Sequence, residues 1–244
     1  MTAEAIVTDA TAIKSPPSVG RALIPLGMAG GTAPIETGRA FGAFDEELYV
    51  HLWFKLSSNW NGPGDGIQQL FQVERFNEPG VPGALVVFGI AGALELQWHN
   101  FGDDAWVQLP NLDASAAEIV RNEWHEIELV LVMNTGTNFD GEIHIWVDGI
   151  KTHVSTVRRF LSADPHHFHK LNWKPIYGSA GSCDREQSID FDHIYVSGKT
   201  LAPVVGFNAI LKALDQTEVA ALDGVLVTEA QQQAPAAPSE LEVT

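Results

Sequence analysis

The sequence predicts an all-β protein: a jelly-roll sandwich of two curved antiparallel sheets, with extended arms at both ends. Several segments alternate apolar and polar side chains with a period of two, which is typical of half-buried strands. Turn residues bound these segments at intervals of roughly 8–12 residues, a spacing found in sandwiches and jelly rolls. The alternation of strands and helices that an α/β fold requires is absent, and we find no internal repeat.

The segment 122–149 carries the strongest signal and predicts a hairpin of two long strands. In its first strand, apolar side chains alternate with Glu126 and Glu128. In its second strand, they alternate with His144 and Trp146. An Asp-Gly pair ends the polar loop between the strands and another begins the next turn, where a positive φ angle is often needed.

The segment 47–60 predicts a second long strand. One face carries only apolar side chains, namely Leu48, Val50, Leu52, Phe54 and Leu56. The other face carries rings and a cation, namely Tyr49, His51, Trp53 and Lys55. Further strands are expected at 66–74, at 84–90 and 93–99 as a hairpin, and at 106–109, 150–160, 171–177 and 187–196. Short helices are expected at 113–120 and 215–222, each with an Asp as its cap.

The chain divides into three parts by composition. Residues 1–44 are rich in Ala, Gly, Pro and Thr and predict an extended N-terminal arm with one edge strand near 22–26. Residues 45–200 hold the strand signals and predict the jelly-roll domain. Residues 201–244 predict a C-terminal arm with one short helix and a low-complexity tail that has no apolar face to bury.

The composition excludes several function classes. The formal net charge is −17 with only 14 Lys and Arg residues, which argues against nucleic-acid and anionic-membrane binding and weighs against a polyanionic substrate. No apolar run approaches the roughly 20 residues of a membrane-spanning helix. The N-terminus lacks the features of a secretory signal, so we expect a protein made in the cytoplasm. With Cys183 as the sole cysteine, no intramolecular disulfide is expected.

Four phrases together resemble the concanavalin A-like lectin/glucanase superfamily, especially its laminin-G-like and polysaccharide-lyase-like members. They are ELYVHLWFKLSSNW at 47–60, NEWHEIEL at 122–129, NT…DGEIHIWVDG at 134–149 and IDFDHIYVSG at 189–198. The resemblance covers about residues 45–200. It implies a jelly roll whose concave face often holds a saccharide. The superfamily contains lectins, hydrolases, lyases and structural domains of phage and cell-surface proteins, so the fold does not decide the function.

The first candidate site is a carbohydrate-binding face. Aromatic rings stack on sugar C–H groups while neighbouring polar groups fix the orientation of the sugar. The side chains that would do this are Tyr49, His51, Trp53, Lys55, His144 and Trp146. In the alternative interpretation both faces of these strands are buried and the rings pack under an arm or a second subunit.

Two enzymatic alternatives remain open. The resemblance implies glucanase carboxylates on one strand in a pattern like E-x-D-x-x-E; Glu126 and Glu128 lie on one face, but the third acid is missing. A retaining pair also requires carboxyls about 5–5.5 Å apart with one raised pKa. Lyases of this fold use a Tyr or His base, with Gln, Asn or Arg neutralising the uronate carboxylate. Tyr49, His51, Lys55, Gln68 and Gln72 are the corresponding candidates.

Metal binding is a weaker alternative, and the expectation is no cofactor. Asn134, Asn138 and Asp140 offer oxygen ligands of the kind that Ca²⁺ prefers, but the bidentate Glu of a committed site is absent. His167 and His169 have a two-residue spacing usable for Zn²⁺ or Cu²⁺, although the sequence places no third or fourth ligand. Asp190 and Asp192 are expected to cap turns or to meet Arg185.

The leading hypothesis is a non-catalytic jelly-roll protein of a larger assembly, a decoration or tail-associated protein on a virion surface. Its arms would bind further copies or other assembly proteins, and its aromatic face would bind carbohydrate. The alternative hypothesis is a polysaccharide lyase or glycoside hydrolase of the concanavalin A-like fold.

Overall fold

The computed structural model describes residues 4–14, 16–44, 47–75, 83–89, 93–100, 107–108, 118–160, 168–178, 180–197 and 227–228. Within these ranges the chain forms strands and no helix. Accordingly, the described residues contain no helix that is long and apolar enough to span a membrane. The strands form two sheets that pack face to face, which confirms the predicted all-β jelly-roll sandwich.

The larger sheet has eight strands, and its neighbouring strands are antiparallel except for one short addition. Its order is β1 (Glu4–Thr8), β2 (Ser18–Ile24), β13 (Gln187–Ser197), β4 (Glu47–Leu56), β9 (His125–Val132), β10 (Gly141–Val147) and β11 (Ile150–Arg158). The addition is β14 (Val227–Thr228), which pairs in parallel with β13. The hairpin predicted at 122–149 is therefore present as β9 and β10, next to the predicted strand β4.

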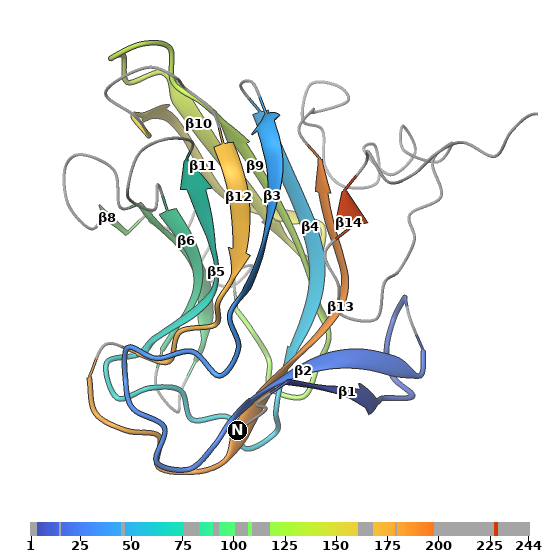
Figure 1. Cartoon of the computed structure of the whole chain (residues 1–244). Coiled ribbons are helices and arrows are strands. Elements are labelled where there is room, and N and C mark those ends of the chain that lie inside the picture. Colours follow the sequence, from blue (N-terminus) through green and yellow to red (C-terminus); the bar gives the residue numbers. More distant parts are fainter. Residues whose placement is uncertain are drawn as a thin grey trace, which may run out of the picture.

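The smaller sheet has six strands. Its order is β3 (Thr37–Phe44), β12 (Phe168–Trp173), β5 (Ile67–Arg75), β6 (Gly83–Phe88), β7 (Glu95–Asn100) and β8 (Val107–Gln108). Figure 1 shows both sheets bowing in the same direction. The outer face of the six-stranded sheet is therefore concave, and we call it the hollow face. The outer face of the eight-stranded sheet is the convex face.

The core lies between the two sheets and is built by the period-two alternation. Leu52 on β4, Ile127 on β9 and Ile145 on β10 are fully buried from one side. Leu85 on β6 and Trp98 on β7 are fully buried from the other. Each fully buried side chain of this size stabilises the fold by roughly 1.5–3 kcal/mol, so the apolar alternation is sufficient to fix which face of each strand points outward.

An irregularity in β13 changes which residues of this strand point outward. Its register with β4 shifts between Asp192 and Tyr195, so that one additional residue is accommodated. Within this shift His193 adopts a positive φ of 50°. Such a bulge reverses the alternation: Phe191 and Ile194 both belong to the core, although they are three residues apart.

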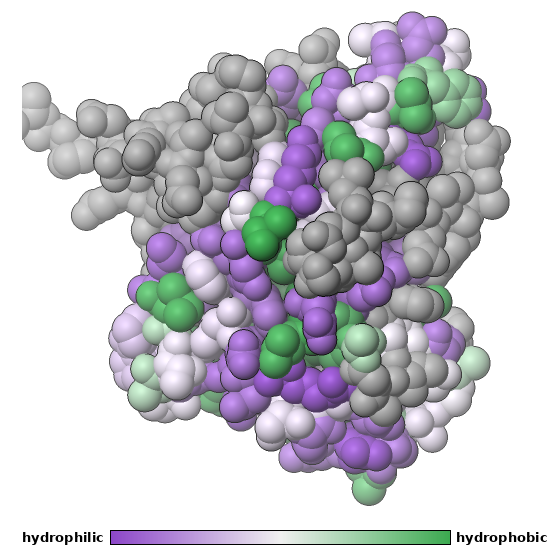
Figure 2. All heavy atoms as spheres, turned by 180° about the vertical axis from the view of Figure 1, so that it is seen from behind, coloured by the Kyte–Doolittle hydropathy of each residue, from purple (hydrophilic) through white to green (hydrophobic). Residues whose placement is uncertain are grey.

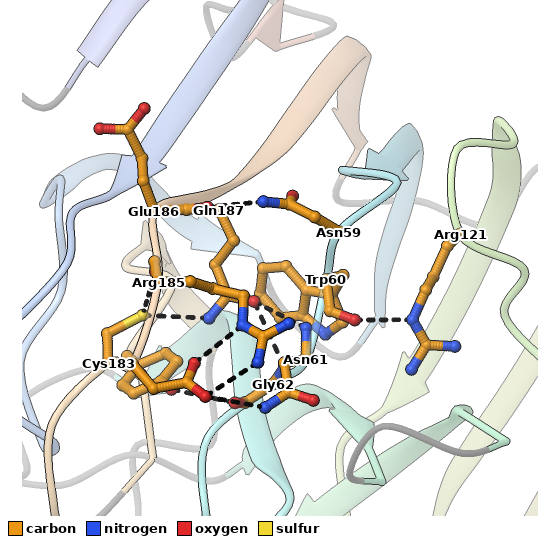
Figure 3. Close-up of polar contacts among 11 residues, drawn as sticks. Asn59, Trp60, Asn61, Gly62, Arg121, Cys183, Arg185, Glu186 and Gln187 are labelled. Carbon is orange, nitrogen blue, oxygen red and sulfur yellow. Dashed lines mark hydrogen bonds and ion pairs between the residues drawn. The ribbon is translucent and has the colours of Figure 1, made fainter.

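A polar cluster closes one end of the sandwich by joining the loop after β4 to the loop before β13 (Figure 3). The side-chain Oε1 of Gln187 accepts hydrogen bonds from the backbone N–H groups of Asn61 at 2.9 Å and Gly62 at 3.3 Å. Its Nε2 donates to the Sγ of buried Cys183 at 3.1 Å. Cys183 is thus a packed, hydrogen-bonded residue of the scaffold.

The predicted arms differ from the structure at the N-terminal end. Residues 1–44 supply β1, β2 and β3, and β2 pairs with β13 while β3 pairs with β12. Residues that the sequence assigns to an arm therefore belong to both sheets. Gly20 and Gly38 lie in these strands. A glycine adds no side chain to the apolar–polar alternation, so a strand that contains one is harder to recognise in the sequence. Most of the predicted C-terminal arm, including the helix at 215–222, lies outside the described residues.

Other boundaries are close to their predictions. Strand β12 begins at Phe168, three residues before the predicted start at Leu171, because Phe168 is buried in the core, where its ring packs edge-on against Phe160. Residues 113–117 of the other predicted helix lie outside the described ranges, and Glu118 forms an isolated bridge with Glu95. Seen from behind, hydrophilic residues cover much of the surface and hydrophobic residues form separate spots (Figure 2).

Candidate functional site

The six residues predicted to bind carbohydrate all lie on the convex face. They come from β4 and from β10, and β9 lies between these two strands. Their alternation is as predicted, but the face is the outward-bowed one (Figure 1). Most are also buried: Tyr49 and His51 are 1% exposed, Trp146 is 4% exposed, and Lys55 and His144 are less than 10% exposed. A saccharide cradled by a concave sheet would not meet these side chains.

Hydrogen bonds within the convex face occupy its central polar groups. The Tyr49 hydroxyl donates to Oε2 of Glu128 at 3.4 Å, and His51 Nε2 lies 3.2 Å from Oε1 of Glu126. Burial raises the pKa of Glu126 to about 7. Burial also lowers the pKa of His51 to about 3 and that of His193 to about 4, so both imidazoles are neutral at pH 7.

The charges of the convex face are paired through the N-terminal residues. Arg21 on β2 donates from Nε and Nη2 to the two carboxylate oxygens of Asp190, at 2.6 and 2.7 Å. Asp9 accepts a hydrogen bond from the Lys55 ammonium, and the backbone N–H of Lys14 donates to Asp192 at 2.8 Å. The two aspartates of β13 thus bind N-terminal residues and not Arg185, the partner that the sequence suggested. That arginine pairs instead with Asp184 at 3.0 Å.

The two aromatic rings of β10, those of His144 and Trp146, also contact other side chains of the protein. His144 and Trp146 stack with ring centroids 6.1 Å apart, and the Lys151 ammonium lies 5.0 Å from the Trp146 ring centroid. His144 Nε2 contacts the carboxylate of Glu142 at 2.7 Å. Most polar and aromatic groups of the convex face thus contact one another, although Trp53 Nε1 and His144 Nδ1 have no hydrogen-bond partner among the described residues. Carbohydrate binding there stays a prediction.

The hollow face carries a second set of polar side chains in register across four strands. In one row, Asn172 on β12 pairs with Gln72 on β5, Gln72 pairs with Ala84 on β6, and Ala84 pairs with His99 on β7. Neighbouring strands are about 4.8 Å apart, so the Cα atoms of Gln72 and His99 are roughly 10 Å apart. Ala84, the smallest residue of the row, lies between them. In the next row, Gln69 and Gln97 flank Val86.

Short contacts organise these side chains. Gln72 Nε2 donates to Gln69 Oε1 at 2.7 Å, and His99 Nε2 lies 3.2 Å from Gln97 Oε1. At the other side of Gln72, Asn172 Nδ2 donates to Glu74 Oε1 at 2.9 Å, and the Lys170 ammonium lies 3.5 Å from the same oxygen.

His99 is the titratable base of this face. Burial lowers its pKa to about 4, so its imidazole is neutral at pH 7 and can accept a proton. The side chains of Gln69, Gln72, Glu74 and Lys170 are partly exposed, whereas His99 is 1% exposed. Any ligand approaching this face therefore meets the side chains of Gln69, Gln72, Glu74 and Lys170 before that of His99.

The lyase set suggested by the sequence is not brought together. Tyr49, His51 and Lys55 lie on the convex face, whereas Gln72 lies on the hollow face of the other sheet. Gln68 is fully buried and pairs with Val87, which points into the core. The segment ELQWHN at 95–100 does alternate in the sequence, and it could have indicated His99. What the sequence could not show is that β5, β6, β7 and β12 are neighbours.

The predicted calcium ligands serve as hydrogen-bonding groups of the hairpin loop. Asp140 accepts from the backbone N–H of Thr135 at 2.8 Å and from the Thr135 hydroxyl. Asn138 donates to that hydroxyl at 3.2 Å, and Asn134 Oδ1 accepts from the backbone N–H of Phe160 at 2.8 Å. No cluster of three His, Cys, Asp or Glu suited to a metal occurs among the described residues. His167 and the side chain of His169 lie outside them.

Comparison with known proteins identifies the fold. Neither a protein-family model nor a curated protein matches the chain. Among solved structures, a mutant alginate lyase in complex with alginate trisaccharide is similar with a TM-score of 0.61 and 15% identity, over 78% of this chain and 86% of that one. The alginate lyase vAL-1 from Chlorella virus is similar with a TM-score of 0.59 and 11% identity, over 78% and 87% of the two chains.

A third similar structure is the endo-beta-1,4-glucuronan lyase from the fungus Trichoderma reesei, with a TM-score of 0.54 and 13% identity over 82% of this chain and 89% of that one. The chain has the concanavalin A-like jelly-roll fold. The resemblance seen in the sequence is thereby confirmed at the level of the fold.

Proposed function

We propose that this concanavalin A-like protein is a polysaccharide lyase that cleaves a uronate-containing glycan on its hollow face. One observation carries the proposal: in one row of the sheet, the amide of Gln72 and the neutral imidazole of His99 flank Ala84, and the amide of Asn172 lies next to Gln72. The fold neighbours add support, since those named above are lyases of alginate or glucuronan.

Elimination from a uronate requires two things of the protein. The sugar carboxylate must be neutralised by hydrogen-bond donors so that the adjacent C5 proton becomes acidic, and a base must remove that proton. Gln72 retains one Nε2 hydrogen beyond the one given to Gln69, and Gln69 retains its own amide donors. These N–H groups are the proposed partners of the uronate carboxylate.

His99 is the proposed base. Its imidazole accepts the C5 proton, the C5 electron pair forms the C4–C5 double bond, and the C4–O bond breaks. The imidazolium then returns the proton to the departing glycosidic oxygen. A uronate carboxylate nearby raises the affinity of the imidazole for a proton, which offsets the effect of burial. Because His99 is buried, its role requires the surface around Ala84 to open when the polymer binds.

The other hypotheses receive less support. Glu126 and Glu128, the candidate hydrolase carboxylates, lie on the convex face and bond to His51 and Tyr49. Glu126 does have the raised pKa of a general acid, but burial beneath the side chains of its own sheet accounts for it. The similar structures named above are lyases by name, and nothing in the fold points to a virion, so the structural role stays a prediction from the sequence.

The test is an elimination assay. The protein is incubated with alginate, glucuronan and hyaluronan, and the ultraviolet absorbance of the unsaturated product is followed. We expect activity on at least one polymer and a loss of 10²-fold or more in His99→Gln, a typical contribution of a general base. His144→Gln on the convex face is the matched control and should retain activity. Absence of unsaturated products from all three polymers would contradict the proposal.

A further inference from the structure

We infer that Glu74 and Asn172 form a subsite for a neutral sugar, so that the substrate carries a neutral residue next to the cleaved uronate. This inference names the substrate class of the proposed lyase and therefore rests on that function. It comes from the hydrogen-bonding groups that remain at the end of the hollow face where β5 and β12 pair.

Two acceptor atoms there lack a donor. Glu74 uses one carboxylate oxygen, Oε1, for both Asn172 and Lys170, and no described residue contacts its Oε2. Asn172 is 4% exposed, and its Oδ1 has no hydrogen-bond partner among the described residues. A buried acceptor without a donor costs about 1–3 kcal/mol, so a ligand hydroxyl that donates to it is favoured.

The charges of the described residues at this end disfavour a second uronate. Lys170 is paired with Glu74, and Lys174 is paired with Glu36 at 2.9 Å, so both ammonium groups already have a carboxylate. Lys174 also holds the pKa of Glu36 below its ordinary value, which keeps that carboxylate ionised. A uronate carboxylate has only acceptors and would face Glu74 directly. Sugar hydroxyls, in contrast, can donate to the partly exposed carboxylate of Glu74 and, where the Asn172 side chain turns outward, to its Oδ1.

The spacing places this subsite next to the proposed cleavage position. Glu74 follows Gln72 by two residues on β5 and lies on the same face of the strand, a separation of about 6.8 Å. A uronate held by Gln72 thus has its neighbouring sugar over Glu74 and Asn172. A polymer of alternating acidic and neutral sugars also carries a lower charge density than a polyuronate, which suits a chain with a net charge of −17.

The first experiment compares kcat/KM on hyaluronan, where glucuronate alternates with a neutral N-acetylhexosamine, with kcat/KM on alginate and glucuronan. We expect the wild type to prefer hyaluronan. Glu74→Gln should shift the preference toward the polyuronates by about tenfold, equivalent to about 1.4 kcal/mol, because it removes the repelling charge. Glu186→Gln is the control, since this exposed side chain points away from its neighbours in the loop before β13 (Figure 3). Equal preference in the wild type, or equal effects of the two variants, would overturn the inference while leaving the lyase function intact.

If no polymer is cleaved, a binding measurement tests whether the neutral-sugar subsite exists. Chitotetraose, a neutral N-acetylglucosamine oligomer, is titrated into the full-length protein by calorimetry. We expect Glu74→Ala and Asn172→Ala to weaken its binding tenfold or more, and Glu186→Ala to leave it unchanged. Absence of binding to the wild type, or affinities unaffected by the first two substitutions, would show that there is no neutral-sugar subsite. Circular dichroism confirms that each variant is folded.

Discussion

Gln72 and His99 stand in one row of the six-stranded sheet, separated only by Ala84. The two side chains come from β5 and β7, and the backbone pairing alone fixes their separation at roughly two strand spacings. An amide donor and a neutral base held in this way face the same region above a small residue. This arrangement makes the hollow face the centre of the proposed activity.

Replacing the amide of Gln72 by a carboxylate should abolish uronate recognition with little change of shape. In Gln72→Glu the new charge repels the sugar carboxylate, so we expect kcat/KM for uronate polymers to fall by 10²-fold or more. High salt should restore part of the loss because it screens a repulsion at a partly exposed position. Steady-state kinetics at low and high ionic strength measure both effects. Wild-type activity in this variant would show that Gln72 does not contact the carboxylate.

The sequence predicts the sandwich well and the candidate site poorly, for one physical reason. Alternation tells which side chains share a face of one strand, and it correctly groups Tyr49 with His51 and Glu126 with Glu128. Nothing in that pattern tells which sheet is concave or which strands are neighbours, because those depend on long-range pairing. His99 therefore had no visible connection with Gln72 across 26 intervening residues.

Residues 1–44 show the same limitation in another form. In the sequence Arg21 is an isolated cation in a Gly-rich stretch. Its role as the partner of Asp190 follows only from the pairing of β2 with β13. The bulge at His193 shows in the sequence only as two consecutive polar residues, Asp192 and His193, and its effect on the strand appears only in the register with β4. Both features require knowledge of the partner strand.

The pKa of Glu126 predicts how stability depends on pH. Burial raises that pKa from 4.5 to about 7, so the folded state binds the proton more tightly than the unfolded state. The stabilisation is complete below pH 4.5 and is lost as the pH rises toward 7. Urea unfolding should show that Glu126→Gln is more stable than the wild type at pH 8, by up to about 3 kcal/mol, with a smaller difference near pH 5. The exposed control Glu186→Gln should show no such dependence, and equal pH profiles for all three proteins would contradict the expectation.

The Arg21–Asp190 pair should contribute measurably to stability, because Asp190 is almost fully buried. Removing one partner of a buried pair costs about 3–5 kcal/mol, and partial exposure of Arg21 reduces this, so we expect about 2 kcal/mol for Asp190→Asn. Asp184→Asn is the matched control: its two-pronged pair with Arg185 has both side chains about half exposed, and water screens an exposed pair, so we expect a clearly smaller loss of stability. Chemical denaturation of both variants measures the difference. Equal losses of stability would mean that burial of Asp190 does not strengthen the pair.

Removing the N-terminal residues should prevent folding, because β2 and β3 are parts of the two sheets. A fragment of residues 45–200 loses β2 beside β13 and β3 beside β12, together with the partners of Asp190 and Lys55. The newly exposed edge of β13 would present unpaired backbone groups and the buried face of Ile189 and Phe191 to water. We expect this fragment to lack a cooperative thermal transition by circular dichroism, whereas residues 1–200 should retain one. A cooperative transition in the 45–200 fragment would show instead that the first 44 residues are a dispensable arm, as their composition suggests.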